Sequence, residues 1–486
     1  MNHQLHFDLS AAARGSMIAH GFEPDFPPPV QAQLEQLRAH PPQPLASARD
    51  LRSLLWSSID NDTSRDLDQI EYVEAASGSG YRVLIGIADV DASVPKGSPI
   101  DAHALRETTT VYTGIDIFSM LPEELSTGST SLLENQERAA VVADFTVDDQ
   151  AQITAGDLYL ARVVNKAQLA YPSIGAWLAG LAPAPPKVAA SPALQQQLHL
   201  QDQIAQRLRR QRFSHGALNL ETIETHPLRV SDGSIDIEAD VRNRATQLIE
   251  DFMIAANSMV AGTLDAKGYS SIRRIVRTPK RWDRIVQLAA EKGTTLPADP
   301  DSKPLHDFLC EQQQKDPDHF ADLSLAVIKL LGPGEYVLEK PGEPPQGHFG
   351  LAVQNYTHST APNRRYADLV SQRLVKAMVA GKPSPYSDDE LASVAAQCTR
   401  MEDAERHVAR EMQKRIAAVA MSGNIGHAYD AIVTGVTEHG SFVRTITPPV
   451  DGMLVRGQQG VDVGDRLRVT LVRTDPVHGF IDFARA

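Results

Sequence analysis

Strand-like segments fall in two separate regions of this chain, and helical periodicity fills most of the sequence between them. The first region runs from residue 56 to about residue 161 and holds short, apolar, β-branched stretches such as YRVLIGIADV and AAVVADFTV. The second begins near residue 423, where short strands alternate with Gly-rich turns up to residue 486. Because strands and helices are grouped rather than alternating, the sequence predicts an α+β fold.

The second strand region has the pattern of a small barrel. Its segments AYDAIVTGVTEHGSFVRTI, GMLV, DRLRVTLVRTD and GFIDFARA read as short strands divided by turns. This pattern is typical of a five-stranded barrel of the oligonucleotide-binding (OB) type. Phe442, in GSFV, either fills the barrel core or faces solvent, where an aromatic ring stacks on a base.

Helices are predicted between these regions and near the N-terminus, where Pro-rich stretches surround them. A Pro/Ala segment at 182–192 interrupts the helical pattern and is predicted to be a surface loop. The expected helices lie at residues 30–38 and 46–55, in a run that ends at 210, and at 240–259 and 391–421.

The charge balance argues against a protein that coats itself with nucleic acid, because 47 Lys+Arg against 61 Asp+Glu gives a net charge of −14. Basic residues still cluster at 207–212 and 273–284, either as a phosphate track or as solvated helix faces. Cys310 and Cys398 lack the spacing of a disulfide framework or a zinc site. Without a signal peptide or a long apolar stretch, we expect a cytoplasmic protein outside the membrane.

The strongest chemical signal is SSIDNDTSRDLDQIEY, residues 57–72. Asp66 and Asp68 are two apart, so an extended segment places both side chains on one face, and the turn-forming residues 61–64 can fold Asp60 back towards them. Clustered carboxylates without His or Cys favour Mg²⁺ or Mn²⁺. The alternatives are an Asp-rich surface turn and a calcium loop, although the Gly and Glu that a calcium loop requires are misplaced.

A second constellation lies at GHFGLAVQNYTHSTAPNRRYADLVSQRLV, residues 347–375. Asn363 is predicted to cap a helix that begins at Arg364, so that Arg364 and Arg365 lie in its first turn and can bind an anion. Arginine can grip phosphate with two parallel hydrogen bonds. The alternative is that both arginines are exposed and pair with Asp368 or with solvent.

Together these segments resemble the ribonuclease II and R family, exoribonucleases built on an RNB catalytic domain. The motifs that carry the resemblance run in order along the chain: SIDNDTSRDLDQ, IGIADVDASVPKGSPID, MLPEELS with SLLENQERAA, YTHSTAPNRRYADL, and GSFV in an S1-like end. The resemblance implies an RNB-type mixed sheet surrounded by helices at 51–422 and an S1 barrel of OB type at 423–486. Residues 1–50 then form a short helical segment in which the family's cold-shock barrels do not fit.

Carried over by position, Asp60, Asp66 and Asp68 match three of the family's four site aspartates, which bind the metal, and Asp68 matches the one most directly tied to catalysis. Gln69 stands where the family has the fourth aspartate, and its amide oxygen can still coordinate. Arg364 matches the arginine that braces the scissile phosphate.

The resemblance also implies an RNA path. Tyr112 matches the aromatic that stacks on the 3′-terminal base, and Tyr171 and Glu250 match positions that contact the terminal nucleotides and sense the ribose 2′-OH. Leu220 stands where ribonuclease II has an aromatic clamp. The alternatives are half-buried tyrosines in structural roles and a Glu250 that pairs with a neighbouring arginine.

The activity that the resemblance implies is hydrolytic 3′→5′ digestion of single-stranded RNA to 5′-nucleoside monophosphates by a monomer that uses Mg²⁺ or Mn²⁺. One alternative is an RNA-binding protein of the same fold with weak or lost catalysis. Another is an endonuclease, which would need an open cleft and would cut circular RNA.

Overall fold

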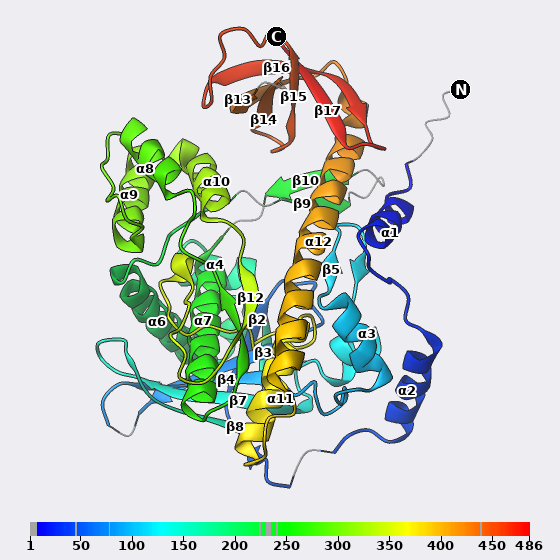
Figure 1. Cartoon of the computed structure of the whole chain (residues 1–486), viewed down its shortest axis with the longest axis vertical. Coiled ribbons are helices and arrows are strands. Elements are labelled where there is room, and N and C mark those ends of the chain that lie inside the picture. The colour runs from blue at the N-terminus through cyan, green and yellow to red at the C-terminus, as the bar shows by residue number, and fades with distance from the viewer. Residues whose placement is uncertain are drawn as a thin grey trace.

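The computed structural model describes residues 7–43, 46–76, 78–222, 225–229, 235–239, 242–437 and 440–486. Its body is built on a six-stranded sheet with the strand order β1-β8-β2-β3-β4-β7 (Figure 1). The longest strand, β8, also pairs with β7 and so joins the two sides of that order. The strands are β1 (Arg49–Asp50), β2 (Trp56–Asp60), β3 (Gln69–Ala75), β4 (Tyr81–Ala88), β7 (Glu137–Val147) and β8 (Ile153–Ala170).

Helices cover this sheet and connect it to the rest of the chain. Three further helices, α8 (Trp282–Glu291), α9 (Ser302–Lys315) and α10 (Phe320–Leu331), form a lobe with its own apolar core. The helices of the body are α3 (Pro99–Glu107), α4 (Tyr171–Leu178), α5 (Pro186–Ala189), α6 (Pro192–Ser214), α7 (Arg244–Ala266), α11 (Tyr366–Val379) and α12 (Asp388–Met421).

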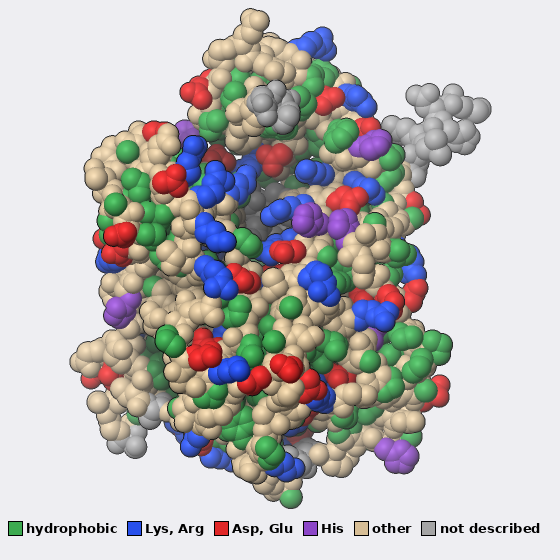
Figure 2. Space-filling view, viewed as in Figure 1, with side chains coloured by type: hydrophobic (Ala, Val, Ile, Leu, Met, Phe, Trp, Pro, Cys, Tyr) green, Lys and Arg blue, Asp and Glu red, His purple; other side chains and the backbone are tan. Residues whose placement is uncertain are grey.

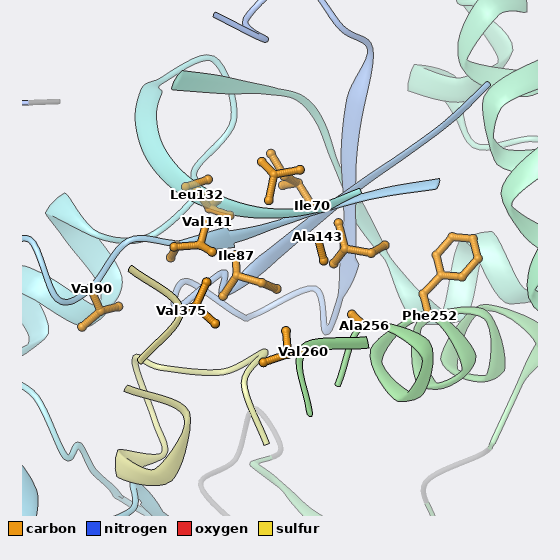
Figure 3. Close-up of a cluster of buried hydrophobic side chains, with 14 of the residues drawn as sticks. Ile70, Ile87, Val90, Leu132, Val141, Ala143, Phe252, Ala256, Val260 and Val375 are labelled. Carbon is orange, nitrogen blue, oxygen red and sulfur yellow. The ribbon is translucent and has the colours of Figure 1, made fainter. Parts of the chain in front are cut away.

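The main core lies between the sheet and helices α7 and α11. Figure 3 shows Ile87 and Val141 of the sheet pointing towards Val260 of α7 and Val375 of α11. The strands supply buried β-branched and small side chains in near-continuous runs, as a sheet covered by helices requires. This packing holds the ends of β2 and β3, where the aspartates lie.

The C-terminal region is a closed barrel of five strands in the order β13-β14-β15-β17-β16. The prediction of a small OB-type barrel is therefore confirmed, and with it the α+β class. Its strands are β13 (Ala428–Thr437), β14 (Gly440–Thr445), β15 (Asp451–Arg456), β16 (Arg466–Asp475) and β17 (Phe480–Arg485).

Helix α12 is 34 residues long and links the body to the barrel (Figure 1). Its N-terminal half joins the main core, whereas Ala418 and Met421 near its end join the core of the barrel. The N-terminal helix α1 (Leu9–Ala19) packs on the middle of α12 through Met17. The helix predicted at 391–421 is confirmed.

Two helix predictions near the N-terminus had different outcomes. The helix expected at 30–38 is present as α2 (Pro28–Ala39). The helix expected at 46–55 is wrong, because part of that stretch is β1, which pairs with β8, while Trp56 Nε1 donates to the Leu51 carbonyl at 2.9 Å and holds a turn. The residues 44 and 45 before it lie outside the described residues.

In the middle of the chain, the run that ends at 210 is confirmed as α6. Most of the helix expected at 240–259 is α7, and its first two residues lie outside the described residues. The surface loop expected at 182–192 is corrected, since it contains the short helix α5, whose Val188 is buried against α6. The apolar contact of Val188 with α6 stabilises a short helix in this stretch despite its Pro/Ala composition.

Three short strand pairs complete the fold. The pairs are β5 (Val111–Tyr112) with β6 (Ile117–Phe118), β9 (Thr225–Arg229) with β10 (Ile235–Ala239), and β11 (Ser271–Ile275) with β12 (Glu335–Glu339).

Among the described residues, no helix combines the length and the apolar composition that crossing a bilayer requires.

Candidate active site

The connection between β2 and β3 carries the three aspartates singled out in the sequence. Asp60 ends β2, and its Oδ1 accepts hydrogen bonds from the Asn61 N–H at 2.7 Å and the Ser64 hydroxyl at 3.0 Å. Residues 61–64 form the expected turn, in which the Ser64 N–H donates to the Asn61 carbonyl at 3.1 Å. Burial raises the pKa of Asp60, and the negative charge of Asp66 raises it further.

Leu67 anchors the stretch between the other two aspartates. Its side chain is buried, and its N–H donates to the Ser131 hydroxyl at 3.0 Å. Asp68 follows directly and is only 2% exposed. Its Oδ1 accepts a hydrogen bond from the Asn363 N–H at 3.0 Å, and its Oδ2 lies 3.6 Å from Nε of Arg364. Two chain segments far apart in sequence therefore meet at Asp68.

The second carboxylate oxygen of Asp68, Oδ2, is buried and lacks the hydrogen bond that Oδ1 has. Oδ2 has no hydrogen-bond partner among the described residues. Burial raises the pKa of Asp68 to about 7, against the lowering effect of the Arg364 charge. Gln69, the first residue of β3, is also buried, and an extended chain directs its side chain away from the side that Asp68 occupies.

Tyr112 lies over the aspartates from β5. Its hydroxyl donates to Oδ2 of Asp66 at 3.1 Å, and its side chain is 43% exposed. Burial of the hydroxyl raises the pKa of Tyr112, and the charge of Asp66 raises it further, so the phenol stays a hydrogen-bond donor. The ring therefore sits beside the carboxylates with one surface open to solvent.

The donor chemistry fits a hard cation. Asp60, Asp66 and Asp68 offer carboxylate oxygens only, and Oδ2 of Asp68 makes no hydrogen bond to a described residue and so keeps lone pairs for a ligand. Within the described ranges, no three His, Cys, Asp or Glu side chains already lie at the separation of a metal site. The three aspartates share one electrostatic neighbourhood, and mutual repulsion opposes a closer approach without a counter-ion. Their role as metal ligands stays a prediction.

The predicted helix cap at Asn363 is wrong. Helix α11 begins at Tyr366, and Arg365 precedes it in an extended conformation. Asn363 is fully buried, and its side-chain oxygen accepts a hydrogen bond from the Thr130 hydroxyl at 2.6 Å. Because its backbone N–H donates to Oδ1 of Asp68, Asn363 holds that carboxylate in place and does not cap the helix.

The two arginines after Asn363 have separate environments and do not lie in the first helical turn. Arg365 donates from Nε and Nη2 to the buried carboxylate of Asp368 at 2.8 and 2.7 Å, so the alternative of an ion pair is correct for this residue. Arg364 keeps 44% of its side chain exposed beside Asp68. Arg364 is thus the more exposed of the two, while Arg365 is tied to Asp368 and lines the same cavity; the contact of either arginine with RNA stays a prediction.

Tyr171 and Glu250 lie on the helical side of the site. Tyr171 is the first residue of α4, and burial together with the charges of Asp60 and Glu71 raises its pKa. Glu250 on α7 forms ion pairs with Arg209 at 3.3 Å and Arg242 at 2.5 Å, which agrees with the alternative that it pairs with a neighbouring arginine. Its contact with RNA stays a prediction.

Phe442, predicted to bind RNA, and Leu220, which replaces the family's aromatic clamp, lie on other parts of the fold. Phe442 on β14 is 38% exposed, so it faces solvent instead of filling the barrel core. Leu220 is partly buried and packs against the apolar core of the α8–α10 lobe.

A cavity of about 220 Å³ adjoins Tyr112 and Arg364. Its wall includes His358 and Tyr336, whose hydroxyl lies 2.7 Å from Nδ1 of His358. Burial lowers the pKa of His358 well below its ordinary value, and the charge of Arg365 lowers it further, so the imidazole is neutral. Tyr112 and Arg364 therefore border this cavity on one side and contact Asp66 and Asp68 on the other.

Sequence reasoning missed the residues that fix this arrangement from a distance. Thr130 holds Asn363 from a position 233 residues away, and no local pattern marks it as part of the site, whereas the pairing of Asp368 with an arginine was named as an alternative from the sequence. Figure 2 shows Lys and Arg side chains gathered around a hollow beneath the barrel, on the face where α10 and α12 lie on either side. The acidic chain thus carries a locally basic face.

Comparison with known domain families matches two parts of the chain. Residues 48–381 match the RNB domain, and residues 427–486 match the RNase II-type exonuclease C-terminal S1 domain. The chain is 28% identical to ribonuclease R of Vibrio cholerae over 464 residues, covering 92% of this chain and 55% of that protein. It is 28% identical to ribonuclease R of Escherichia coli over 444 residues, covering 88% and 54%.

The fold is also similar to a solved structure, that of Mycoplasma genitalium RNase R in complex with ribose methylated single-stranded RNA. The TM-score is 0.84 at 23% identity, covering 99% of this chain and 78% of that one. The chain spans about half the length of the curated relatives it matches.

Proposed function

The chain belongs to the RNB family, and from that premise we propose that it is a 3′→5′ exoribonuclease that hydrolyses single-stranded RNA to 5′-nucleoside monophosphates. The observation that carries the proposal is the environment of Asp68. This carboxylate is buried, has one oxygen without a hydrogen-bond partner among the described residues, and lies at ion-pair distance from an exposed arginine, Arg364. A buried carboxylate next to an accessible guanidinium suits a site that handles phosphodiesters.

Asp60, Asp66 and Asp68 are the residues that would hold Mg²⁺ or Mn²⁺. When bound, such an ion activates water for in-line attack on phosphorus and offsets the charge of the leaving oxygen. Arg364 is placed to neutralise charge on the non-bridging phosphate oxygens, and the ion pair of Arg365 with Asp368 fixes the loop that carries it.

The RNA path in this proposal ends at Tyr112. Its open ring surface receives the 3′-terminal base, while its hydroxyl is held by Asp66. Tyr171 and Glu250 face the terminal nucleotides from the helical side. Phe442 offers a second, distant stacking surface on the barrel, where basic side chains surround the hollow of Figure 2. We place the enzyme in the cytoplasm as a monomer, and its two unpaired thiols, Cys310 and Cys398, suit a reducing compartment.

A binding protein without catalysis is the second candidate, favoured by one observation. Gln69 stands where the family has a fourth aspartate, and a neutral amide brings no charge to a cation.

The test is a gel of products from a 5′-labelled single-stranded RNA incubated with Mg²⁺ or with EDTA. We expect a ladder that shortens from the 3′ end with Mg²⁺ and an intact strand with EDTA. Retarded but uncut RNA under both conditions would favour the binding protein. A circular RNA of the same sequence is the control, because cleavage of a circle would indicate an endonuclease.

A further inference from the structure

One arginine of the motif SLLENQERAA, residues 131–140, is half-buried and has no acidic partner. Arg138 is the second residue of β7, and no acid among the described residues forms an ion pair with it. Burial lowers the pKa of Arg138, and no nearby charge opposes this effect. Its guanidinium is therefore held by hydrogen bonds to neutral groups.

These hydrogen bonds span a short backbone segment, residues 128–131. Nε of Arg138 donates to the Ser131 carbonyl at 2.9 Å, and Nη2 donates to the Gly128 carbonyl at 3.0 Å. Nη1 donates to the carbonyl of Glu137 at 3.0 Å, and Nη2 also donates to the side-chain oxygen of Gln136. Because the guanidinium is planar and rigid, it fixes the two ends of the segment relative to each other.

Ser131 connects this segment to the stretch that carries Asp66. Its side chain is fully buried, and its Oγ accepts a hydrogen bond from the Leu67 N–H at 3.0 Å and donates to the Arg65 carbonyl at 2.6 Å. The N–H of Leu132 also donates to the Leu67 carbonyl at 2.9 Å. The backbone on both sides of Asp66 is therefore held from residues 131 and 132.

Thr130 connects the same segment to Asp68 by a separate route. Its hydroxyl donates to Oδ1 of Asn363 at 2.6 Å, and the Asn363 N–H donates to Oδ1 of Asp68 at 3.0 Å. All three residues are buried. Two neighbouring hydroxyls in the segment that Arg138 holds thus reach the surroundings of two different aspartates.

We propose that Arg138 is a positioning residue for Asp66 and Asp68. It acts through residues 128–131, whose two hydroxyls hold the backbone and the amide around these aspartates. The inference rests on the proposed function, because it assumes that the aspartates take part in RNA cleavage. Misplacing a reacting group by about 1 Å can cost about 100-fold in rate. Loss of Arg138 should therefore lower the rate of cleavage far more than the affinity for RNA.

The test is single-turnover digestion of a 5′-labelled single-stranded RNA, with the full chain in saturating excess and Mg²⁺ present. Arg138→Met should lower the rate constant at least tenfold, while all of the RNA is still digested in the end. The dissociation constant for the same RNA, measured by fluorescence anisotropy in EDTA, should stay within about twofold of the wild-type value. Arg138→Lys keeps a donor for one carbonyl and should give an intermediate rate constant.

Arg82→Met is the matched control. Arg82 lies on β4 of the same sheet and is also partly buried, but it pairs with Glu74 and Asp144. Its variant should lose stability in urea unfolding and digest RNA with the wild-type rate constant. The comparison separates positioning from destabilisation, because unfolded protein reduces the amount of active enzyme and leaves the rate constant at saturation unchanged.

Two variants of Thr130 test the route to Asp68. Thr130→Val removes the hydroxyl and should lower the rate constant at least fivefold, whereas Thr130→Ser keeps it and should stay within about twofold of the wild type. The hydroxyl also lies 2.7 Å from the Leu125 carbonyl, but the Thr130 N–H donates to the same carbonyl at 3.1 Å, so that contact survives in both variants. Combined with Arg138→Met, Thr130→Val should have a smaller effect than it has alone.

The outcomes separate the two proposals. If the wild type digests RNA and Arg138→Met has the rate constant of Arg82→Met, the assignment of Arg138 is wrong and the proposed function stands. A variant that loses only RNA affinity would also overturn the assignment. If Arg138→Met does not fold, equal rate constants for Thr130→Val and Thr130→Ser would overturn it. If the wild type does not digest RNA, the proposed function fails and the assignment fails with it.

Discussion

The hydroxyl of Tyr112 donates a hydrogen bond to Oδ2 of Asp66 across 3.1 Å, although 46 residues separate the two in sequence. This bond ties the ring that would receive a base to a carboxylate that would hold the metal. Movement of the ring and movement of the carboxylate are therefore coupled. The hydroxyl and the ring surface can be tested separately.

Tyr112→Ala should leave cleavage chemistry in place but lengthen the final undigested product by one nucleotide or more. The variant loses the innermost stacking contact, worth about 1–3 kcal/mol per base. Tyr112→Phe is the matched control, because it keeps the ring and loses only the bond to Asp66, so its end product should match that of the wild type. Product lengths on a sequencing gel decide the matter, and equal lengths for all three proteins would remove Tyr112 from the RNA path.

Asp68→Asn should abolish hydrolysis while RNA binding stays close to that of the wild type. The substitution removes a charge at the one buried aspartate oxygen that has no hydrogen-bond partner among the described residues, and it leaves Arg364 in place. Asp62→Asn is the control, since Asp62 is exposed in the turn before it. Initial rates with labelled RNA provide the measurement. Retention of more than about a tenth of wild-type turnover, a loss below about 1.4 kcal/mol, would mean that Asp68 is misassigned.

Asp368→Ala should destabilise the fold by about 3 kcal/mol, because it strips the Arg365 guanidinium of its counter-charge and the Ala361 N–H of its acceptor. Urea unfolding followed by circular dichroism gives the free energy. The double variant Asp368→Ala with Arg365→Met removes both charges and should recover part of the lost free energy of unfolding. The exposed pair of Asp403 with Arg406 is the control, where Asp403→Ala should cost under about 1 kcal/mol. Equal losses at the two sites would contradict the role given to Asp368.

Glu107 should make stability fall as pH rises. Burial raises its pKa from 4.5 to about 7, against the lowering effect of the hydrogen bond from the Glu23 N–H. Below pH 4.5 both the folded and the unfolded chain hold the proton, and the group imposes no penalty. Between pH 4.5 and about 7 only the unfolded chain releases it, so the free energy of unfolding falls, by about 3 kcal/mol at most.

Urea unfolding at pH 5 and pH 8 tests this direction. Glu107→Gln cannot titrate, so it should lose less stability than the wild type between the two pH values. The exposed Glu123→Gln should follow the wild type. If the free energy of unfolding of the wild type instead rises relative to that of Glu107→Gln between pH 5 and pH 8, the carboxyl ionises in the folded chain without cost and the expected direction is wrong.

Local patterns predicted much of this fold. The β-branched runs of β4 and β7, the periodicity of α12 and the turn-divided strands of the barrel all follow from spacing that a short window contains. The turn at 61–64 is equally local, since its hydrogen bonds join residues within four of each other.

The site itself was predictable only in part, because its decisive contacts are long-range. Asn363 looks like a helix cap until its N–H is seen to serve Asp68, 295 residues away. Oδ1 of Asp368 also accepts from the Ala361 N–H, so the burial of this carboxylate depends on the loop fold and not on the short spacing to Arg365. Helix α1 was missed for the same reason, since its place depends on apolar contact with α12.

Helix α12 is one continuous helix that takes part in three separate apolar cores. It spans about 50 Å without a break, and it enters the core of the body, the cluster that holds Val111 beside Tyr112, and the core of the barrel. A displacement of the barrel relative to the body would therefore have to bend or shift the same helix that packs against Val111, the residue next to Tyr112.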